Sequence, residues 1–226
     1  MRSIVLFSKA PEPGKVKTRL ASHMSDIDAA SFHAAFVLDT LDSLSALENT
    51  DRYLACYPDK EHTFFKELEE NFDIKAFNQQ GGDLGKKMEN AFLYLRDEGY
   101  KEIVLIGSDS PTLPVEILNE AFERLKKNEL VIGPSFDGGY YLIGISGEVP
   151  DIFGGIEWGE NKVFEETLKK AKDCKVDFSI LPFWYDIDTI KELSFMQIHL
   201  DDMNEGRCAR TRTMVKLFNE TNGGMI

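Results

Sequence analysis

A short basic segment stands out in an otherwise acidic chain. Residues 9–19 hold Lys9, Lys15, Lys17 and Arg19 against one carboxylate, Glu12, so the segment carries a local charge of +3. Gathered cations repel one another, and a bound anion would relieve that repulsion. Two prolines and a glycine in the segment disfavour a simple helix, and a glycine lets the backbone approach an anion closely. We therefore predict a phosphate-binding loop, with a solvated basic turn as the alternative.

Two details refine this prediction. Thr18 is a candidate N-cap for a short helix, whose first N–H groups would add to the positive field. The segment is not a P-loop, because it lacks the Gly-x-x-x-x-Gly-Lys-Ser/Thr pattern. Gly14 and the four basic residues are therefore the candidate phosphate ligands.

Two aspartates could hold a divalent cation beside such phosphates. Asp109 directly follows the apolar run 103–107, and Asp188 belongs to the D-x-D sequence at 186–188. Mg²⁺ takes oxygen ligands and needs only one or two carboxylates when substrate phosphates supply the rest. The alternatives are structural: Asp109 could cap a turn, and Asp188-Thr189 could begin a helix near Ile190.

Two glycine-containing loops are further candidates for ligand contact. Asp137-Gly138-Gly139 precedes Tyr140, and its glycines allow a ligand close approach; a bulge or hairpin turn is the structural alternative. The loop 79–85 includes Asp83 and Gly85 and could line a base or sugar pocket, or form a plain helix-entry turn.

These loops fall after expected strands. Apolar and β-branched runs predict strands at 4–7, 52–57, 74–77, 103–107 and 130–133, and residues 140–145 read as a further strand. Helical spacing at 26–47, 61–70, 84–96, 115–125 and 161–171 alternates with them, followed by extended 178–185 and a terminal helical stretch. This alternation predicts a mostly parallel sheet with helices on both faces, which binds ligands beyond the carboxyl ends of its strands.

Composition excludes several other classes of protein. The 226 residues carry 26 Lys and Arg against 39 Asp and Glu, a net charge of −13, and the part outside the basic segment carries −16. This deficit disfavours nucleic acid and anionic membranes as partners. The three cysteines lie far apart and predict neither a zinc site nor a disulfide framework. We find no signal-peptide pattern or membrane-spanning run and expect a cytoplasmic protein.

Five motifs, taken in order, resemble the bacterial DUF2064 family, whose members are often called glycosyltransferases of the GT-A, nucleotide-diphospho-sugar transferase type. They are F-S-K-A-P-E-P-G-K-V-K-T-R-L at 7–20, G-D-L-G-K-K-M at 82–88, I-G-S-D-S-P-T-L-P at 106–114, G-P-S-F-D-G-G-Y-Y-L-I-G at 133–144 and D-I-D-T at 186–189. The resemblance covers residues 1–195 and implies a single three-layer α/β/α GT-A domain over 1–226, with a helical extension at about 196–226.

The resemblance also implies roles for individual residues. Nucleotide contacts fall on Lys9, Gly14, Lys15, Lys17, Arg19, Asp83 and Gly85, and Asp109 and Asp188 become ligands of Mg²⁺ or Mn²⁺. Substrate contacts fall on Asp137, Gly138, Gly139, Tyr140 and Trp158, with Asp137 and Arg19 as the catalytic candidates. Relatives tend to have Trp-Ser/Thr-Thr where this chain has Trp158-Gly159-Glu160-Asn161, which weakens the expectation for acceptor contacts.

The leading hypothesis is a metal-dependent glycosyltransferase that uses a nucleotide-diphospho-sugar donor and an unidentified small-molecule acceptor. Two alternatives remain open. A nucleotidyltransferase would join an NTP to a phosphorylated small molecule and release pyrophosphate, and a non-catalytic regulatory protein would bind nucleotide without turnover.

Overall fold

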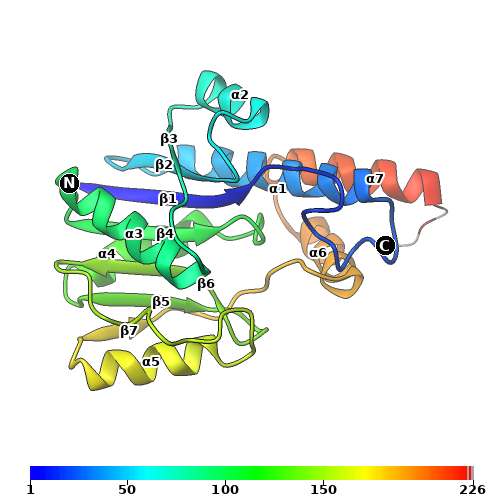
Figure 1. Ribbon diagram of the computed structural model, residues 1–226. Coiled ribbons are helices and arrows are strands. Elements are labelled where there is room, and N and C mark those ends of the chain that lie inside the picture. Colours follow the sequence, from blue (N-terminus) through cyan, green and yellow to red (C-terminus); the bar gives the residue numbers. More distant parts are fainter. Residues whose placement is uncertain (223, 225–226) are drawn as a thin grey trace.

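In this computed structural model, which describes residues 1–222 and 224, one mixed sheet forms the centre of the molecule (Figure 1). Within those residues, seven strands follow the order β3-β2-β1-β4-β6-β5-β7. Their bounds are β1 (Arg2–Lys9), β2 (Asp51–Tyr57), β3 (Lys75–Asn78), β4 (Glu102–Gly107), β5 (Leu130–Pro134), β6 (Tyr140–Ser146) and β7 (Phe178–Ile180). The expected strands are all present. The sheet is mostly parallel, but β6 runs antiparallel to both β4 and β5.

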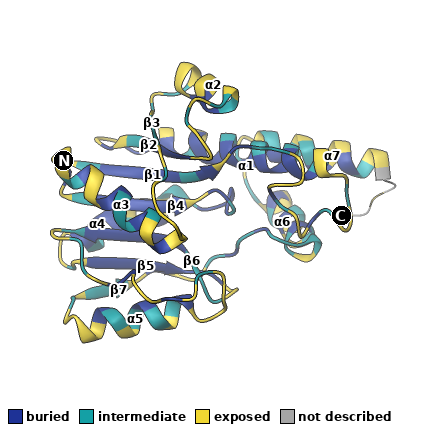
Figure 2. Cartoon of the chain, in the orientation of Figure 1, coloured by how far each residue is buried: buried dark blue, intermediate teal, exposed yellow. Residues whose placement is uncertain are grey.

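Helices cover both faces of this sheet and complete the predicted three layers. They are α1 (Asp26–Ser45), α2 (Thr63–Asn71), α3 (Leu84–Asp97), α4 (Val115–Leu125), α5 (Val163–Asp173), α6 (Ile190–Asp202) and α7 (Ala209–Asn222). Alternate strand residues point to opposite faces. Ile4 and Leu6 pack in the same cluster as residues of α1 and α4, whereas Val5 packs in the cluster that includes residues of α3. The strands are accordingly buried on both sides (Figure 2).

The helix α1 is buried more completely than a surface helix would be. Val37, Leu41 and Leu44 pack toward the sheet, and Phe32 and Phe36 belong to a second cluster with α6 and α7. The buried carboxylate of Asp39 accepts hydrogen bonds from two backbone N–H groups at the start of α7, at 3.2 and 2.7 Å. This contact fixes α7 on α1, because an anion stabilises a helix N-terminus.

One local expectation needs correction. The segment at Thr18 forms consecutive turns over 18–23 and no helix, so no helix N-terminus adds to the basic loop. The C-terminal stretch is helical as expected and consists of two helices, α6 and α7; α6 begins at Ile190 with Thr189 as its N-cap, which is the structural alternative given for Asp188-Thr189. Residues 223, 225 and 226 of that stretch lie outside the described residues.

A strap formed by residues 181–188 brings the C-terminal part of the chain along the carboxyl edge of the sheet (Figure 1). Its backbone N–H groups at 181 and 184 donate to Ile132 and Pro134 of β5, at 2.9 and 3.1 Å. Ile187 N donates to the carbonyl of Asp109 at 2.9 Å, directly after β4. Tyr185 anchors the strap further, since its hydroxyl accepts from Thr112 at 2.8 Å and lies 2.7 Å from His199 Nδ1. The edge of β4 and the D-x-D motif are therefore adjacent.

Candidate functional site

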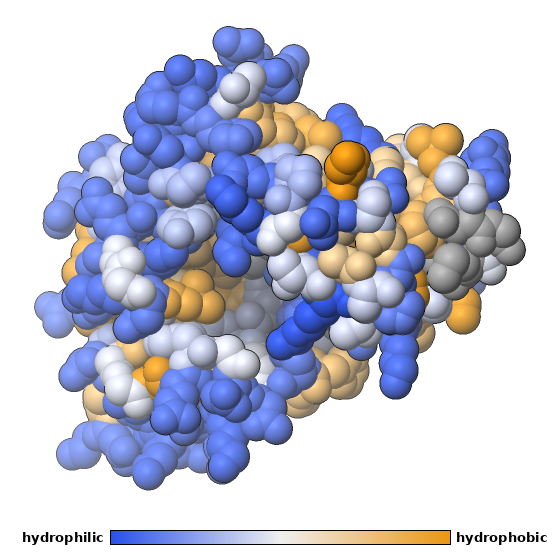
Figure 3. Space-filling view, turned by 45° about the vertical axis from the view of Figure 1, so that its right-hand side comes forward, coloured by the Kyte–Doolittle hydropathy of each residue, from blue (hydrophilic) through white to orange (hydrophobic). Residues whose placement is uncertain are grey.

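A cavity of about 410 Å³, here called the central pocket, opens at the carboxyl ends of β1 and β4. Figure 3 shows the face of the molecule hollowed, with hydrophilic side chains around the hollow. The lining includes side chains from the basic loop, the β4 end and the strap: Lys9, Lys15, Lys17, Arg19, His33, Gln79, Ser108, Asp109, Tyr140, Asp186 and Asp188. Three of the predicted loops therefore do meet at one place.

Lys17 is the best-buried cation of this pocket, with 3% of its side chain exposed. Its ammonium group forms an ion pair with Asp109, lies 3.4 Å from Asp188 Oδ1 and donates to the carbonyl of Ile187 at 2.5 Å. Three oxygen atoms from two distant segments therefore converge on one positive charge. The prediction that Lys17 binds a phosphate stays a prediction, because in this structure its ammonium faces carboxylates.

The electrostatics of the two neighbouring aspartates differ. Burial alone would raise the pKa of Asp109, but the Lys17 ammonium outweighs it and holds the pKa below its ordinary value. Burial raises the pKa of Asp186 to about 7, and the charges of Asp109, Asp137 and Asp188 act in the same direction. Asp186 is thus a poorly compensated carboxyl at the centre of the site.

Asp186 is a site residue that the sequence analysis left out of its assignments. An extended chain places alternate residues on the same side. Ile187 is fully buried, while the aspartates on either side of it both line the central pocket. The hydroxyl of Ser110 donates to Asp186 Oδ1 at 2.5 Å. The D-x-D pattern itself was the available signal, since both of its carboxylates could have been assigned.

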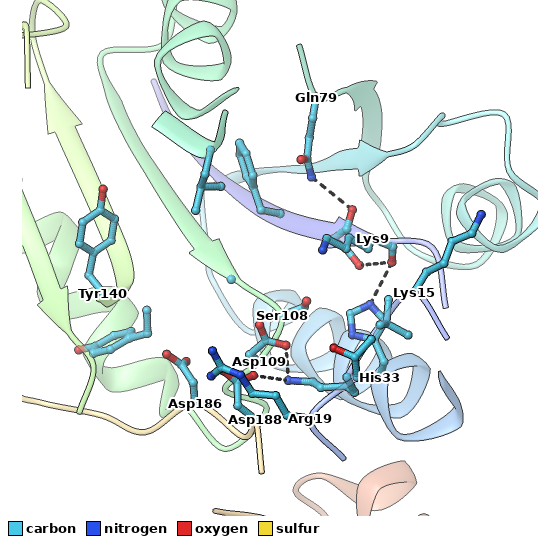
Figure 4. Close-up of a pocket in the computed structure, with 18 residues that line it drawn as sticks. Lys9, Lys15, Arg19, His33, Gln79, Ser108, Asp109, Tyr140, Asp186 and Asp188 are labelled. Atoms are coloured by element: carbon cyan, nitrogen blue, oxygen red, sulfur yellow. Dashed lines mark hydrogen bonds and ion pairs between the residues drawn. The ribbon is translucent and has the colours of Figure 1, made fainter. Parts of the chain in front are cut away.

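His33 is a second residue that sequence reasoning missed. It lies on α1, is 4% exposed, and its Nε2 donates to the backbone carbonyl of Lys9 at 3.0 Å (Figure 4). Burial lowers its pKa, so the ring is neutral, and Nδ1 has no hydrogen-bond partner in the described part of the chain. No sequence signal marked it, because it shares the helical spacing of the apolar residues around it.

The remaining basic residues of the central pocket, Lys9, Lys15 and Arg19, are exposed. Lys15 pairs with Glu12 within the loop, and Arg19, with 67% of its side chain exposed, lies 3.4 Å from Asp188 Oδ2. Lys9 and Lys15 line the central pocket with Arg19, as expected for phosphate ligands. Gly14 does not line it, although its φ of +76° shows why the loop has glycine there.

Two residues predicted to contact the nucleotide also have structural roles, and their contact with a nucleotide stays a prediction. Asp83 caps α3, since its side chain accepts from the backbone N–H of Lys86 at 2.7 Å. A Cβ on Gly85 would lie 2.4 Å from the ring of Trp158, so this glycine is required for packing. Neither residue lines the central pocket, whereas Leu84 between them does.

The predicted substrate residues gather in a second cavity of about 480 Å³, here called the tryptophan pocket. Asp137, Gly139, Tyr140 and Trp158 line it, and the rings of Tyr140 and Trp158 meet edge to face at 6.4 Å. Gly138 instead packs against the backbone of Asn161. The tryptophan pocket shares Arg19, Leu84, Tyr140 and Asp186 with the central pocket, so one ligand can extend through both.

Asp137 occupies the turn after β5. Its Oδ1 accepts from the hydroxyl of Ser135 and from Gly139 N at 3.0 Å, so the carboxylate stabilises its own turn. Oδ2 takes part in no hydrogen bond found in the described residues. The structural role and a catalytic role are therefore compatible in one side chain.

Comparison with known proteins agrees with this architecture. Residues 40–160 match DUF2064, a family described as uncharacterized proteins conserved in bacteria. The structure of a candidate nucleotide-diphospho-sugar transferase from Desulfovibrio desulfuricans G20 is 35% identical, with a TM-score of 0.87. That match covers 98% of this chain and 96% of the other.

More distant structures share the fold alone. The 4-diphosphocytidyl-2C-methyl-D-erythritol synthase from Anaerococcus prevotii DSM 20548 is 12% identical, with a TM-score of 0.56 over 88% of this chain and 96% of that chain. A CMP:2-keto-3-deoxy-manno-octonic acid synthetase, solved in complex with CTP, is 7% identical, with a TM-score of 0.56 over 89% and 99%. The predicted fold class is therefore confirmed. Within the described residues, no helix is long and apolar enough to cross a membrane.

Proposed function

Because this chain belongs to the DUF2064 family, we propose that it is a glycosyltransferase that uses a nucleotide-diphospho-sugar and a divalent metal ion. One observation carries the proposal. Asp109 and Asp188, from segments far apart in the sequence, converge on a single cation position beside the lysines and arginine of the basic loop. Converging carboxylates and exposed cations at one sheet edge suit a metal-bound diphosphate.

The donor atoms fit Mg²⁺ or Mn²⁺. Asp109 Oδ1, Asp188 Oδ1 and the carbonyl of Ile187 surround the Lys17 ammonium, and oxygen is the ligand type that these ions prefer. The described residues contain no group of three His, Cys, Asp or Glu side chains that could hold a metal, so phosphate and water oxygens would complete the ligand set. When bound, such an ion neutralises charge that builds up on a departing diphosphate.

The basic loop would hold the same diphosphate. Lys9, Lys15 and Arg19 line the central pocket, and fixed cations placed where charge develops stabilise a transition state. Arg19 also lines the tryptophan pocket, which puts it where the phosphate and the sugar of a donor would join.

Asp137 is the proposed base for an inverting transfer. It lines the tryptophan pocket beside Trp158, where we place the donor sugar, and its Oδ2 is available to accept a proton. The acceptor hydroxyl oxygen bonds to the anomeric carbon as its proton passes to Asp137. The bond from that carbon to the phosphate oxygen breaks, and the nucleoside diphosphate leaves with the electron pair.

Replacing Asp109 by Asn tests the proposal directly. We expect Asp109→Asn to keep its fold and to lose Mn²⁺-dependent binding of nucleoside diphosphates in calorimetry, because one of the two converging carboxylates is gone. Asp73→Asn, which alters an exposed aspartate paired with Arg52, is the control and should bind normally. Unchanged binding by Asp109→Asn would contradict the metal site.

Product analysis separates glycosyl transfer from nucleotidyl transfer, which the fold also accommodates. The protein is incubated with the four NTPs and with nucleotide sugars in the presence of Mn²⁺. Slow hydrolysis of one nucleotide sugar is the expected result. Pyrophosphate release that requires a sugar phosphate would instead establish a nucleotidyltransferase.

A further inference from the structure

A third cavity, here called the aromatic pocket, is lined in part by the strap residues Tyr185, Asp186 and Asp188. It measures about 420 Å³, and its lining combines rings with charged groups: Arg19, Phe136, Asp137, Tyr185, Asp186, Asp188, Thr189, Lys191, Glu192 and Phe195. Arg19 and Asp186 line all three cavities. The aromatic pocket therefore adjoins the place where the proposed reaction would break the bond between the donor sugar and the phosphate.

Its aromatic walls are exposed but held in place. Phe136 is 73% exposed and stacks on Phe183 at 5.6 Å, and Phe183 in turn meets Phe164 edge to face at 6.3 Å. Phe195, which also lines the pocket, is 54% exposed and contacts Tyr185 edge to face at 4.9 Å. Exposed rings held in fixed orientations around a cavity are typical of a binding site, because burying them on a ligand releases water.

The charges of the lining distinguish possible ligands. With Asp186 left out because of its raised pKa, three carboxylates face two cations in the aromatic pocket, whereas the central pocket has four cations against two carboxylates. An anionic ligand would therefore be attracted to the central pocket and repelled from the aromatic pocket. Carboxylates that accept hydrogen bonds from hydroxyl groups, next to rings that stack on a flat face, suit an uncharged hydroxylated ring compound.

We propose that the aromatic pocket is the acceptor site and that it binds an uncharged, hydroxyl-bearing ring compound between Phe136 and Phe195. This assignment rests on the proposed function, since it names that reaction's second substrate. Asp137 lines both the aromatic pocket and the tryptophan pocket. A hydroxyl group bound between the two rings thus lies beside the proposed base, and the donor sugar lies on the base's other side.

Saturation-transfer NMR with a matched pair of probes tests this assignment. Phenyl β-D-glucopyranoside is uncharged, and phenyl β-D-glucuronide differs from it by a carboxylate at C6. We expect the glucoside to receive saturation from the protein, and the glucuronide to bind about five-fold more weakly because of the unbalanced carboxylates. Equal or tighter binding of the glucuronide would contradict the proposal that the ligand is uncharged. Saturation transfer to neither probe would contradict the proposal that the aromatic pocket is an acceptor site.

Variants locate the binding. Phe136→Ala and Phe195→Ala should each weaken glucoside binding about five-fold, because each removes one stacking surface. Ile198→Ala is the matched control, since Ile198 is 70% exposed on the same helix as Phe195 but does not line the pocket. Full binding by both phenylalanine variants would overturn the location.

Calorimetry with nucleoside diphosphates and Mn²⁺ keeps the two proposals separable. Phe136→Ala and Phe195→Ala should bind nucleotide like the wild type, because neither residue lines the central pocket. A wild-type protein that binds glucoside but no nucleotide would overturn the proposed function. One that binds nucleotide but no glucoside would overturn only the acceptor site.

Discussion

The loop after β4 and the loop after β5 each place an aspartate at the carboxyl edge of the sheet, but they hold it differently. Asp109 pairs with Lys17 from the basic loop, and its backbone carbonyl accepts from Ile187 of the strap. Asp137 is held by Ser135 and Gly139, which are both two residues away. The contacts of Asp109 hold the basic loop and the strap together at the end of β4. The contacts of Asp137 hold only its own turn and engage Oδ1, so Oδ2 is available to accept a proton.

The largest effect that this comparison predicts is on turnover. Asp137→Asn should lower hydrolysis of the nucleotide-sugar donor by about 100-fold or more, because the amide cannot accept the proton that a general base removes. Nucleotide affinity and stability should stay close to wild type, since Asn Oδ1 can still accept the hydrogen bonds of the turn. Hydrolysis rates and calorimetry measure the two quantities.

Glu160→Gln is the control for this variant, because Glu160 is another carboxylate of the tryptophan pocket. Its hydrolysis rate should remain within about two-fold of wild type, as expected for a group outside the proton transfer. An Asp137→Asn protein with full activity would leave Asp137 a turn residue only.

Substitutions of Gly138, after β5, and Gly107, at the end of β4, should have different effects: the first on stability and the second on nucleotide binding. Gly138 has a φ of +92°, and a Cβ there would lie 2.0 Å from the carbonyl oxygen of Asn161. Gly138→Ala should therefore lower the free energy of unfolding by about 2–3 kcal/mol, measured by urea denaturation.

At Gly107, at the end of β4, we expect an effect on nucleotide binding but little effect on stability. No heavy atom lies within 4 Å of a Cβ built there, so Gly107→Ala should change stability by less than about 0.5 kcal/mol. The added methyl group would instead project from a residue of the central pocket and weaken nucleotide binding. If Gly107→Ala were the less stable of the two variants, this distinction between the loops would be wrong.

Local sequence patterns predicted the helices and strands, but they did not predict the order and direction of every strand in the sheet. The spacing of apolar residues after Pro114 predicted α4 with its observed bounds, because one face of that helix is buried. The position of β6 between β4 and β5 could not be predicted, since a strand's sequence pattern does not state its direction or its neighbours. The strand ends themselves were predictable, and with them the loops that form the site.

Contacts between side chains far apart in the sequence could not be predicted from the sequence. The basic loop suggested four phosphate ligands, yet Lys17 is buried against Asp109 and the strap, which only the folded chain brings together. Asp83 and Gly85 were predicted as ligand contacts, and their roles as a helix cap and a packing site were not. A polar residue near a ligand-binding edge has the same local sequence whether it contacts the ligand or supports the loop.

Lys17→Met is the most direct test of the convergent carboxylates. Without the ammonium, Asp109 loses its ion-pair partner and Asp188 keeps only Arg19, so the free energy of unfolding should fall by about 2 kcal/mol. The loss stays below that of a fully buried pair, because the two carboxylates are 43% and 37% exposed. Mn²⁺ should then raise the melting temperature of Lys17→Met more than that of the wild type, since the carboxylates can bind the ion in place of the ammonium.

Lys15→Met, which removes a surface ion pair with Glu12, is the control. It should lower the free energy of unfolding by less than about 0.5 kcal/mol and respond to Mn²⁺ like the wild type. Equal Mn²⁺ responses in Lys17→Met and the wild type would mean that the two carboxylates do not form a cation site.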